Sequence, residues 1–160
     1  MADSERRLDA DAQNTRALSC TERLAVYSLC GPCIEVCFTA VWELLENGNR
    51  RLHGLSSVHA FVIYGLSLLV MEAMYTRTTD SLGWPVRGLL YLVWSYTWEF
   101  TSGLLLRQID ACPWDYEPYF SGHFMGLITF EYAPLWYTAG VVGERLVLRN
   151  VLQLRLPDNS

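Results

Sequence analysis

Three glutamates lie within long apolar stretches of the sequence, where an ionisable side chain is costly. They are Glu35, Glu99 and Glu131, and no basic residue is expected at a comparable depth. A central acidic residue costs a membrane helix roughly 2.5–3.5 kcal/mol. The pattern predicts either a pathway for a proton, a cation or a small solute, or a hydrogen-bonded structural network, and both readings stay open.

Four further residues are secondary candidates for the same site. Glu43 closes the first apolar stretch, Trp98 lies within the third, and Asp115 and Tyr116 follow in a proline-containing turn. Indole and phenol groups can donate hydrogen bonds to a buried carboxylate. The turn is predicted to lie as an outer lid over the carboxylate face.

The tetrapeptide Cys30-Gly31-Pro32-Cys33 is that of thioredoxin-type active sites. Those sites place the motif at a helix N-terminus after a strand, which lowers the pKa of a thiol. Here the motif lies inside an apolar helix. A membrane quinone reductase would also need a second cysteine pair on the outer side, where only Cys112 is expected. Redox chemistry is therefore disfavoured, and no cofactor is predicted.

The loop between the third and fourth apolar stretches carries potential metal ligands, namely Asp110, Asp115, Glu117 and His123. Their spacing matches no standard metal site, so no metal is predicted. The sequence contains no HExxH motif, no glycine-rich phosphate loop and no recognisable Ser/His/Asp arrangement. No catalytic residue is assigned, and the balance is against an enzyme.

The charge composition excludes several classes of function. All twelve basic residues are arginine, because the sequence contains no lysine, and the net charge is -5. A chain without lysine cannot form a P-loop or a lysine Schiff base. A nucleic-acid partner would require a clustered basic surface, which is absent from this composition.

Four apolar stretches predict an all-α, polytopic membrane protein built as a four-transmembrane-helix bundle. Each is about 20 residues long, enough to cross a hydrocarbon core of ~30 Å. The spans are residues 24–45, 55–75, 86–106 and 124–148, within one domain of residues 23–150, with a disordered tail at residues 1–22 and a short tail at residues 151–160. Nine of the twelve arginines fall on one side, which predicts cytosolic termini in a membrane that stays unspecified.

Two short matches suggest that a helical hairpin is duplicated. Thr39–Glu43 resembles Ser95–Glu99, and Glu72-x4-Arg77 resembles Glu144-x4-Arg149. Parallel repeats of this kind occur in transporters, although similar short matches also arise by chance in aromatic-rich helices. Glu72 and Glu144 are expected near the cytosolic helix ends, where each can reach water or its following arginine.

Several of these segments carry a family resemblance. They are Thr39-Ala40-Val41-Trp42-Glu43, Ile63-Tyr64-Gly65, Trp98-Glu99-Phe100-Thr101, Ala111-Cys112-Pro113-Trp114-Asp115-Tyr116 and Gly126-Leu127-Ile128-Thr129. The chain resembles the transmembrane protein 229 family, which is related to bacterial CmpB-like proteins labelled type IV ABC-transporter. The resemblance covers about residues 27–155. It implies a multi-pass membrane protein of four helices and carries over no particular biochemical activity.

Three functions follow as hypotheses. The first is a solute, proton or cation pathway that uses Glu35, Glu99 and Glu131. The second is a non-catalytic accessory or assembly subunit, because a chain without a P-loop could at most be the membrane partner of an ATPase. The third is a membrane-embedded enzyme that uses Asp115 and Glu99. The expected partners are the lipid bilayer and either a second copy of the chain or another membrane protein.

Overall fold

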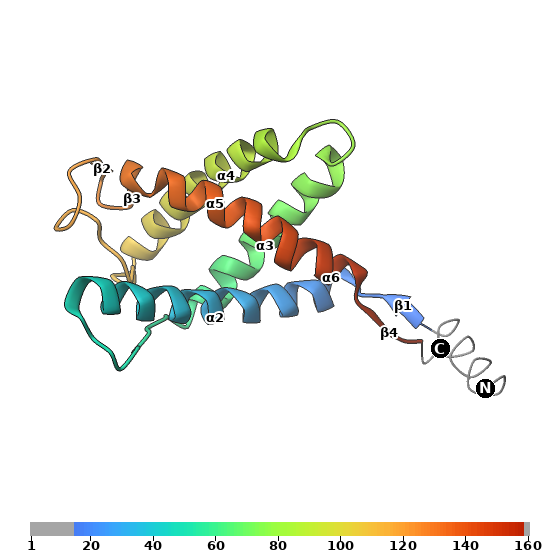
Figure 1. Ribbon diagram of the computed structural model, residues 1–160, viewed down its shortest axis with the longest axis horizontal. Coiled ribbons are helices and arrows are strands. Elements are labelled where there is room, and N and C mark those ends of the chain that lie inside the picture. Colours follow the sequence, from blue (N-terminus) through green and yellow to red (C-terminus); the bar gives the residue numbers. More distant parts are fainter. Residues whose placement is uncertain (1–14, 159–160) are drawn as a thin grey trace.

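The structure, a computed structural model, describes residues 15–158 and is mostly helical. Its helices are α2 (Cys20–Asn47), α3 (His59–Thr78), α4 (Trp84–Arg107) and a continuous last helix made of α5 (Ala133–Gly143), the π-helical segment η2 (Glu144–Leu148) and α6 (Arg149–Gln153). α2 packs mainly against α3, and α4 packs mainly against α5. The described chain therefore forms two consecutive helical hairpins (Figure 1).

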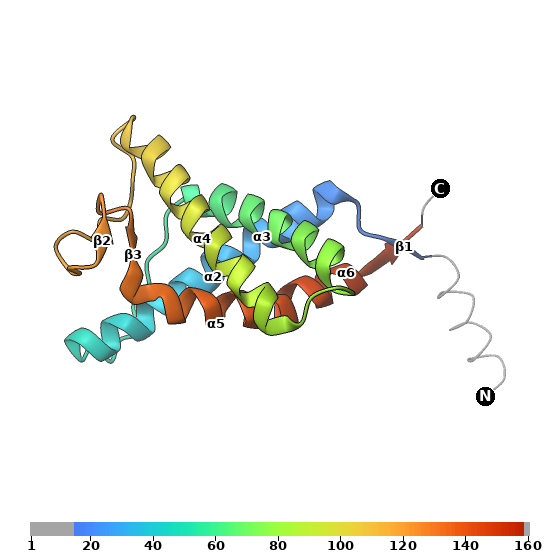
Figure 2. The same ribbon diagram turned by 90° about the horizontal axis from the view of Figure 1, so that it is seen from above.

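The two hairpins run in the same direction. α2 and α4 both begin near the end of the molecule where the termini lie, and α3 and α6 return there (Figure 2). At that end β1 (Thr15–Ala17) pairs antiparallel with β4 (Arg155–Pro157). At the opposite end β2 (His123–Phe124) pairs with β3 (Ile128–Thr129), and the 3-10 turn η1 (Phe130–Tyr132) leads into α5.

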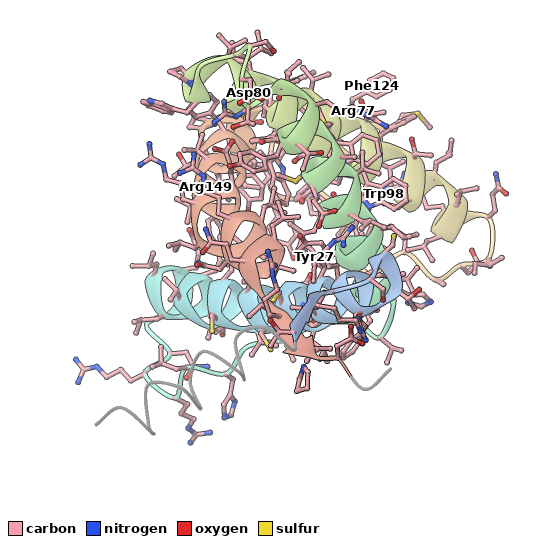
Figure 3. The ribbon with its side chains drawn as sticks, turned by 90° about the vertical axis from the view of Figure 1, so that its right-hand side faces the viewer. Tyr27, Arg77, Asp80, Trp98, Phe124 and Arg149 are labelled. Carbon is pink, nitrogen blue, oxygen red and sulfur yellow. The ribbon has the colours of Figure 1, made fainter. Side chains whose placement is uncertain are left out.

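The distribution of apolar side chains is that of a protein associated with a membrane. The buried core is small and consists of Tyr27, Met71, Tyr91, Leu148 and Val151. Figure 3 looks from the end that carries the termini and labels Tyr27 where the helices cross. Many large apolar side chains instead face outward from the helices, and α2 and α3 are each long and apolar enough to cross a membrane.

A capping box fixes the start of α2. Ser19 Oγ accepts a hydrogen bond from the Glu22 amide at 3.3 Å, and a Glu22 carboxylate oxygen accepts one from the Ser19 amide at 2.7 Å. Arg16 of β1 also pairs with Glu22 at 2.7 Å. Residues 15–22, predicted as part of a disordered tail, are thus ordered, because local hydrogen bonds organise this polar segment. The rest of the predicted tail, residues 1–14, lies outside the described residues.

The last helix begins later than predicted. Its apolar stretch starts at Phe124, but residues 123–132 form the β2–β3 hairpin and η1, so the helix starts at Ala133. Met125 and Gly126 have positive φ angles of 53° and 66°, which a helix cannot accommodate. Glu131 therefore precedes the helix. At the other end, α6 and β4 occupy most of the predicted tail at 151–160, of which residues 159–160 lie outside the described part.

Glycines permit close crossing within each hairpin. A Cβ atom on Gly31 of α2 would lie 2.0 Å from Tyr64 Cβ of α3, and one on Gly65 would lie 2.1 Å from Ser28 Oγ. In the second hairpin, a Cβ on Gly88 would lie 2.6 Å from the Tyr137 ring. Small residues at such contacts let helix backbones approach closely in membranes.

Gly31→Ala is expected to lower the free energy of unfolding by ~1–3 kcal/mol, because the added methyl group overlaps the Tyr64 side chain. Gly143→Ala is the matched control, since its Cβ would meet no atom within 4 Å. Thermal unfolding of the purified protein measures both variants. Equal melting temperatures for the two variants would contradict the close crossing.

Candidate functional site

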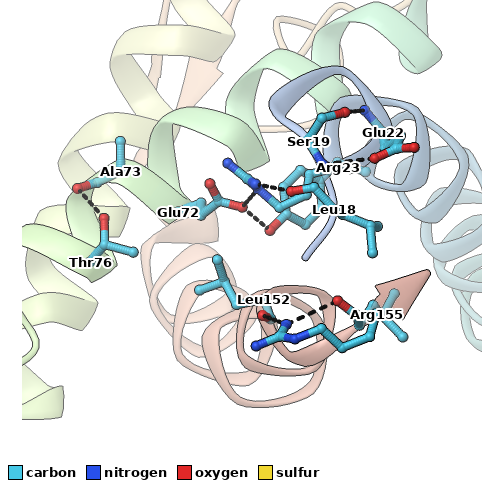
Figure 4. Close-up of polar contacts among 11 residues, drawn as sticks. Leu18, Ser19, Glu22, Arg23, Glu72, Ala73, Thr76, Leu152 and Arg155 are labelled. Atoms are coloured by element: carbon cyan, nitrogen blue, oxygen red, sulfur yellow. Dashed lines mark hydrogen bonds and ion pairs between the residues drawn. The ribbon is translucent and has the colours of Figure 1, made fainter. Parts of the chain in front are cut away.

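A buried carboxylate joins the two helices of the first hairpin. Glu72 of α3 accepts hydrogen bonds from Arg23 Nε at 2.8 Å and from the Tyr27 hydroxyl at 2.6 Å, both from α2. Arg23 Nη1 also donates to the Leu18 carbonyl at 2.6 Å, as Figure 4 shows. Glu72 is only 6% exposed. We call Arg23, Tyr27 and Glu72 the first clamp.

The second hairpin contains the same arrangement. Glu144 of η2 accepts from Arg87 Nε at 2.7 Å and Nη2 at 2.6 Å, and from the Tyr91 hydroxyl at 2.8 Å. Arg87 Nη1 donates to the Leu82 carbonyl, and Arg149 lies 3.4 Å from the same carboxylate. We call Arg87, Tyr91 and Glu144 the second clamp. It neutralises a carboxylate that is almost completely buried.

The two clamps correspond residue by residue. The arginines (23 and 87), the tyrosines (27 and 91) and the accepting leucine carbonyls (18 and 82) are each separated by 64 positions. Ser19 and Gly83, which precede α2 and α4, have closely similar dihedrals of φ -64°, ψ 164° and φ -65°, ψ 155°. The two hairpins are therefore structural repeats.

This correspondence corrects the register inferred from the sequence. The matched segments Thr39–Glu43 and Ser95–Glu99 align Glu99 with Glu43, whereas the spacing of the clamps aligns Glu99 with Glu35. The expectation for Glu72 and Glu144 is also wrong in one respect. Both are buried, and each is held chiefly by the arginine of the preceding helix. The Arg-x3-Tyr pattern at the start of α2 and of α4 is a sequence signal of this repeat register, but it does not identify the two glutamates.

Glu99 lies further along α4, in different surroundings. Its Oε1 accepts a hydrogen bond from the Tyr116 hydroxyl at 2.6 Å, while its buried Oε2 has no hydrogen-bond partner. Trp136 Nε1 of α5 approaches this carboxylate but is also buried without a well-formed hydrogen bond. Among the described residues no arginine or histidine pairs with Glu99, so its charge is not balanced as those of Glu72 and Glu144 are.

Glu35 occupies the equivalent position in the first hairpin. Its Oε2 accepts a hydrogen bond from Ser56 Oγ at 2.6 Å, and the side chain is half-buried. Each of the two glutamates thus receives a hydroxyl group from the loop that closes its own hairpin. Tyr64 of α3 interacts electrostatically with both Glu35 and Glu99.

The structure does not bring Glu131 into this group. It is exposed and precedes α5, where it accepts hydrogen bonds from the Gly122 amide at 2.9 Å and from Thr129 Oγ1. The Thr129 hydrogen bond, followed by that from Gly122, lowers the pKa of the Glu131 carboxyl group below its ordinary value. Glu131 stabilises the β2–β3 turn region and is not a deep residue of the last helix.

The secondary candidates are placed differently from one another. Tyr116 contacts Glu99 directly, whereas Glu43 is half-buried and accepts a hydrogen bond from Asn47 at 2.9 Å. Trp98 Nε1 donates to the Ile63 carbonyl at 2.9 Å and so joins α4 to α3. Asp115 lies 3.4 Å from Arg107 at the protein surface. Of these four, only Tyr116 is hydrogen-bonded to a candidate carboxylate.

The loop that carries Tyr116 is fixed over Glu99 by several contacts. Trp114 Nε1 donates to the Leu127 carbonyl at 3.1 Å, and the Tyr116 amide donates to the Gly126 carbonyl at 2.8 Å. The rings of Tyr116, Phe120 and Tyr132 pack edge to face, with centroids 5.0–6.1 Å apart. This aromatic packing holds the Tyr116 side chain in place beside Glu99.

Outward-facing apolar helices around buried carboxylates define a membrane-associated helical protein. The model of the family described as "Putative ABC-transporter type IV" (ABC_trans_CmpB) matches residues 23–159, and the chain belongs to this family. No solved structure matches the chain.

Glu144→Gln is expected to lower the free energy of unfolding by about 3–5 kcal/mol, because it leaves Arg87 charged and buried without its partner. Arg16→Gln is the control, since it removes an exposed ion pair and should leave the unfolding midpoint almost unchanged. Chemical denaturation in detergent measures both. A Glu144→Gln protein as stable as the control would show that the second clamp does not hold the hairpin together.

Proposed function

We propose that the protein is a polytopic membrane protein whose four spans are α2, α3, α4 and the last helix α5–α6, with both termini in the cytosol. α4 has 24 residues, ~36 Å at 1.5 Å per residue, which suffices to cross a bilayer. The β1–β4 pairing supports an even number of crossings, because it holds both ends of the described chain together. The arginine distribution supports the orientation.

Within its family, we assign the chain to the transmembrane protein 229 branch. This assignment rests on the motifs around Trp42-Glu43, Trp98-Glu99 and Cys112–Tyr116. In the structure two of these motifs meet, because Tyr116 of the third binds Glu99 of the second.

The function that the site supports best is a pathway for a proton, a cation or a small cationic solute, with Glu99 as its central group. The observation that carries this proposal is the buried Glu99 Oε2, which has no hydrogen-bond partner and no neighbouring arginine among residues 15–158. A carboxyl group removed from water must be neutralised, and here only a proton or a bound cation can do so.

The contacts of the two clamps separate the glutamates that are already neutralised from those available to such a pathway. Glu72 and Glu144 are already neutralised by Arg23 and Arg87, so they have no free capacity to bind a transported cation. Among the described residues, Glu99 and Glu35 accept well-formed hydrogen bonds from the hydroxyl groups of Tyr116 and Ser56, which leave the carboxylate charge unbalanced. Glu35 is half-buried at the equivalent position and is the second member of the pathway.

Glu99→Gln is expected to abolish pH-dependent cation flux in proteoliposomes, because the amide can neither release a proton nor balance a cation. Glu35→Gln is expected to reduce the flux. Glu43→Gln is the matched control, since Glu43 is half-buried like Glu35 but lies near the end of α2, where it binds Asn47 of the same helix. Unchanged flux in both Glu99→Gln and Glu35→Gln would refute the pathway.

The family and the composition favour a second candidate function, an accessory subunit of a transport complex. The chain has no lysine and hence no P-loop, so any ATP hydrolysis must come from another polypeptide. Purification in a mild detergent after crosslinking is expected to recover a nucleotide-binding partner, and ATPase activity in the complex checks the assignment. A monomer without any crosslinked partner would count against this function.

A further inference from the structure

We infer that the N-terminal part of α2, residues 20–31, is a mobile arm that is hinged at Pro32 and held closed by the first clamp, whereas α4 is fixed. This inference concerns a conformational device of the first hairpin and does not depend on the proposed transport function. It rests on differences between two structural repeats that are otherwise equivalent.

The two clamps differ in strength. The first clamp has a single arginine contact with its carboxylate, and the side chains of Arg23 and Glu72 are 22% and 7% exposed. In the second clamp two nitrogens of Arg87 bind both oxygens of Glu144, with exposures of 4% and 2%, and Arg149 adds a third contact. Bidentate, desolvated pairs are the more strongly bound. The first clamp is therefore the one that opens more readily.

α2 also contains the proline that a hinge requires. Pro32 lies within α2, where it cannot donate the backbone hydrogen bond to Ser28, whereas Pro85 of α4 occupies the first helical turn and removes no such bond. Gly31 packs against Tyr64 directly before the proline. The backbone ladder of α2 is thus weakened next to a close helix contact, which serves as the pivot.

The part of α2 beyond the proline is anchored separately. Thr39 Oγ1 accepts a hydrogen bond from the Leu55 amide at 2.8 Å and lies 3.0 Å from the Leu55 carbonyl. Ser56 of the same loop binds Glu35 at 2.6 Å. Among the described residues, the hydrogen bonds of the part before the proline to α3 all end on Glu72. Opening the first clamp therefore removes these hydrogen bonds and leaves those at the carboxylate end of the hairpin in place.

The arm is connected to the chain termini. β1 pairs with β4, and Arg16 of β1 pairs with Glu22 in the first turn of the arm. A displacement of the C-terminal strand would be transmitted through these contacts to Arg23, which follows Glu22 directly. The terminal sheet thus couples the first clamp to the end of the second hairpin.

Hydrogen–deuterium exchange of the full-length protein in lipid nanodiscs tests the inference by comparing residues 20–31 with the equivalent residues 84–95. Amides of the arm are expected to exchange at least about tenfold faster, because they open locally at a lower free energy. Tyr27→Phe should accelerate exchange in the arm by about a further tenfold, as a hydrogen bond to a charged group is lost. Tyr91→Phe, the matched control, should change residues 84–95 by less than about threefold because the bidentate arginine pair remains.

Pro32→Ala provides a second, independent variant that retains both clamps. It restores the missing hydrogen bond and should slow exchange in residues 20–31 without affecting residues 84–95. Equal exchange in the two segments of the unmodified protein would overturn the inference. So would equal responses to Tyr27→Phe and Tyr91→Phe, or an unchanged arm in Pro32→Ala.

Discussion

The fold depends on a carboxylate that is buried between two helices and bonded there by an arginine and a tyrosine. Such a group is expensive to desolvate, and only complete pairing makes the burial tolerable. Glu144 meets this requirement with both oxygens, which fixes the position of η2 against the start of α4. Glu72 joins α3 to α2 through one oxygen, Oε2, which accepts from both Arg23 and Tyr27. One interaction, used twice, aligns the two hairpins at the end where the termini lie.

The same constraint separates acidic residues that are neutralised by arginine from those that are not. A glutamate already paired with arginine contributes to stability, whereas one that accepts only hydroxyl groups retains an unbalanced charge. Glu99 and Glu35 belong to the second kind and lie at equivalent positions of the repeats. The loops that bind them differ, since Tyr116 belongs to a packed aromatic loop and Ser56 to a short, exposed one. The repeats thus share a framework and differ in how they enclose their carboxylates.

Part of this arrangement could be predicted from the sequence. The lengths of the apolar stretches predicted α2, α3 and α4 to within a few residues. The aromatic motifs indicated a family resemblance, and the family match supports its broader part, the relation to CmpB-like proteins. The prediction for the last helix was wrong at its start, because the apolar residues from Phe124 onward run without a break in pattern into α5, and the backbone of Met125 and Gly126 forms a turn there. That turn removes Glu131 from the carboxylate group.

The clamps could not be predicted because their partners are distant in the sequence. Arg23 and Glu72 are 49 residues apart, and Arg87 and Glu144 are 57 apart, so no local pattern links them. Matching aromatic segments in the sequence indicate one alignment of the two repeats. In the structure, the arginine and tyrosine that bind each buried carboxylate define a different alignment. Without the partner helix in place, Glu72 and Glu144 look like ordinary residues near a helix end.

A double-mutant cycle on Arg87 and Glu144 tests most directly whether these buried pairs hold the hairpins together. Arg87→Leu and Glu144→Leu are each expected to destabilise the protein strongly, because each leaves one buried charge unpaired. The double variant should recover much of that loss, with a coupling energy of about 2–3 kcal/mol in chemical denaturation. Additive losses, with no coupling between the two positions, would contradict the account.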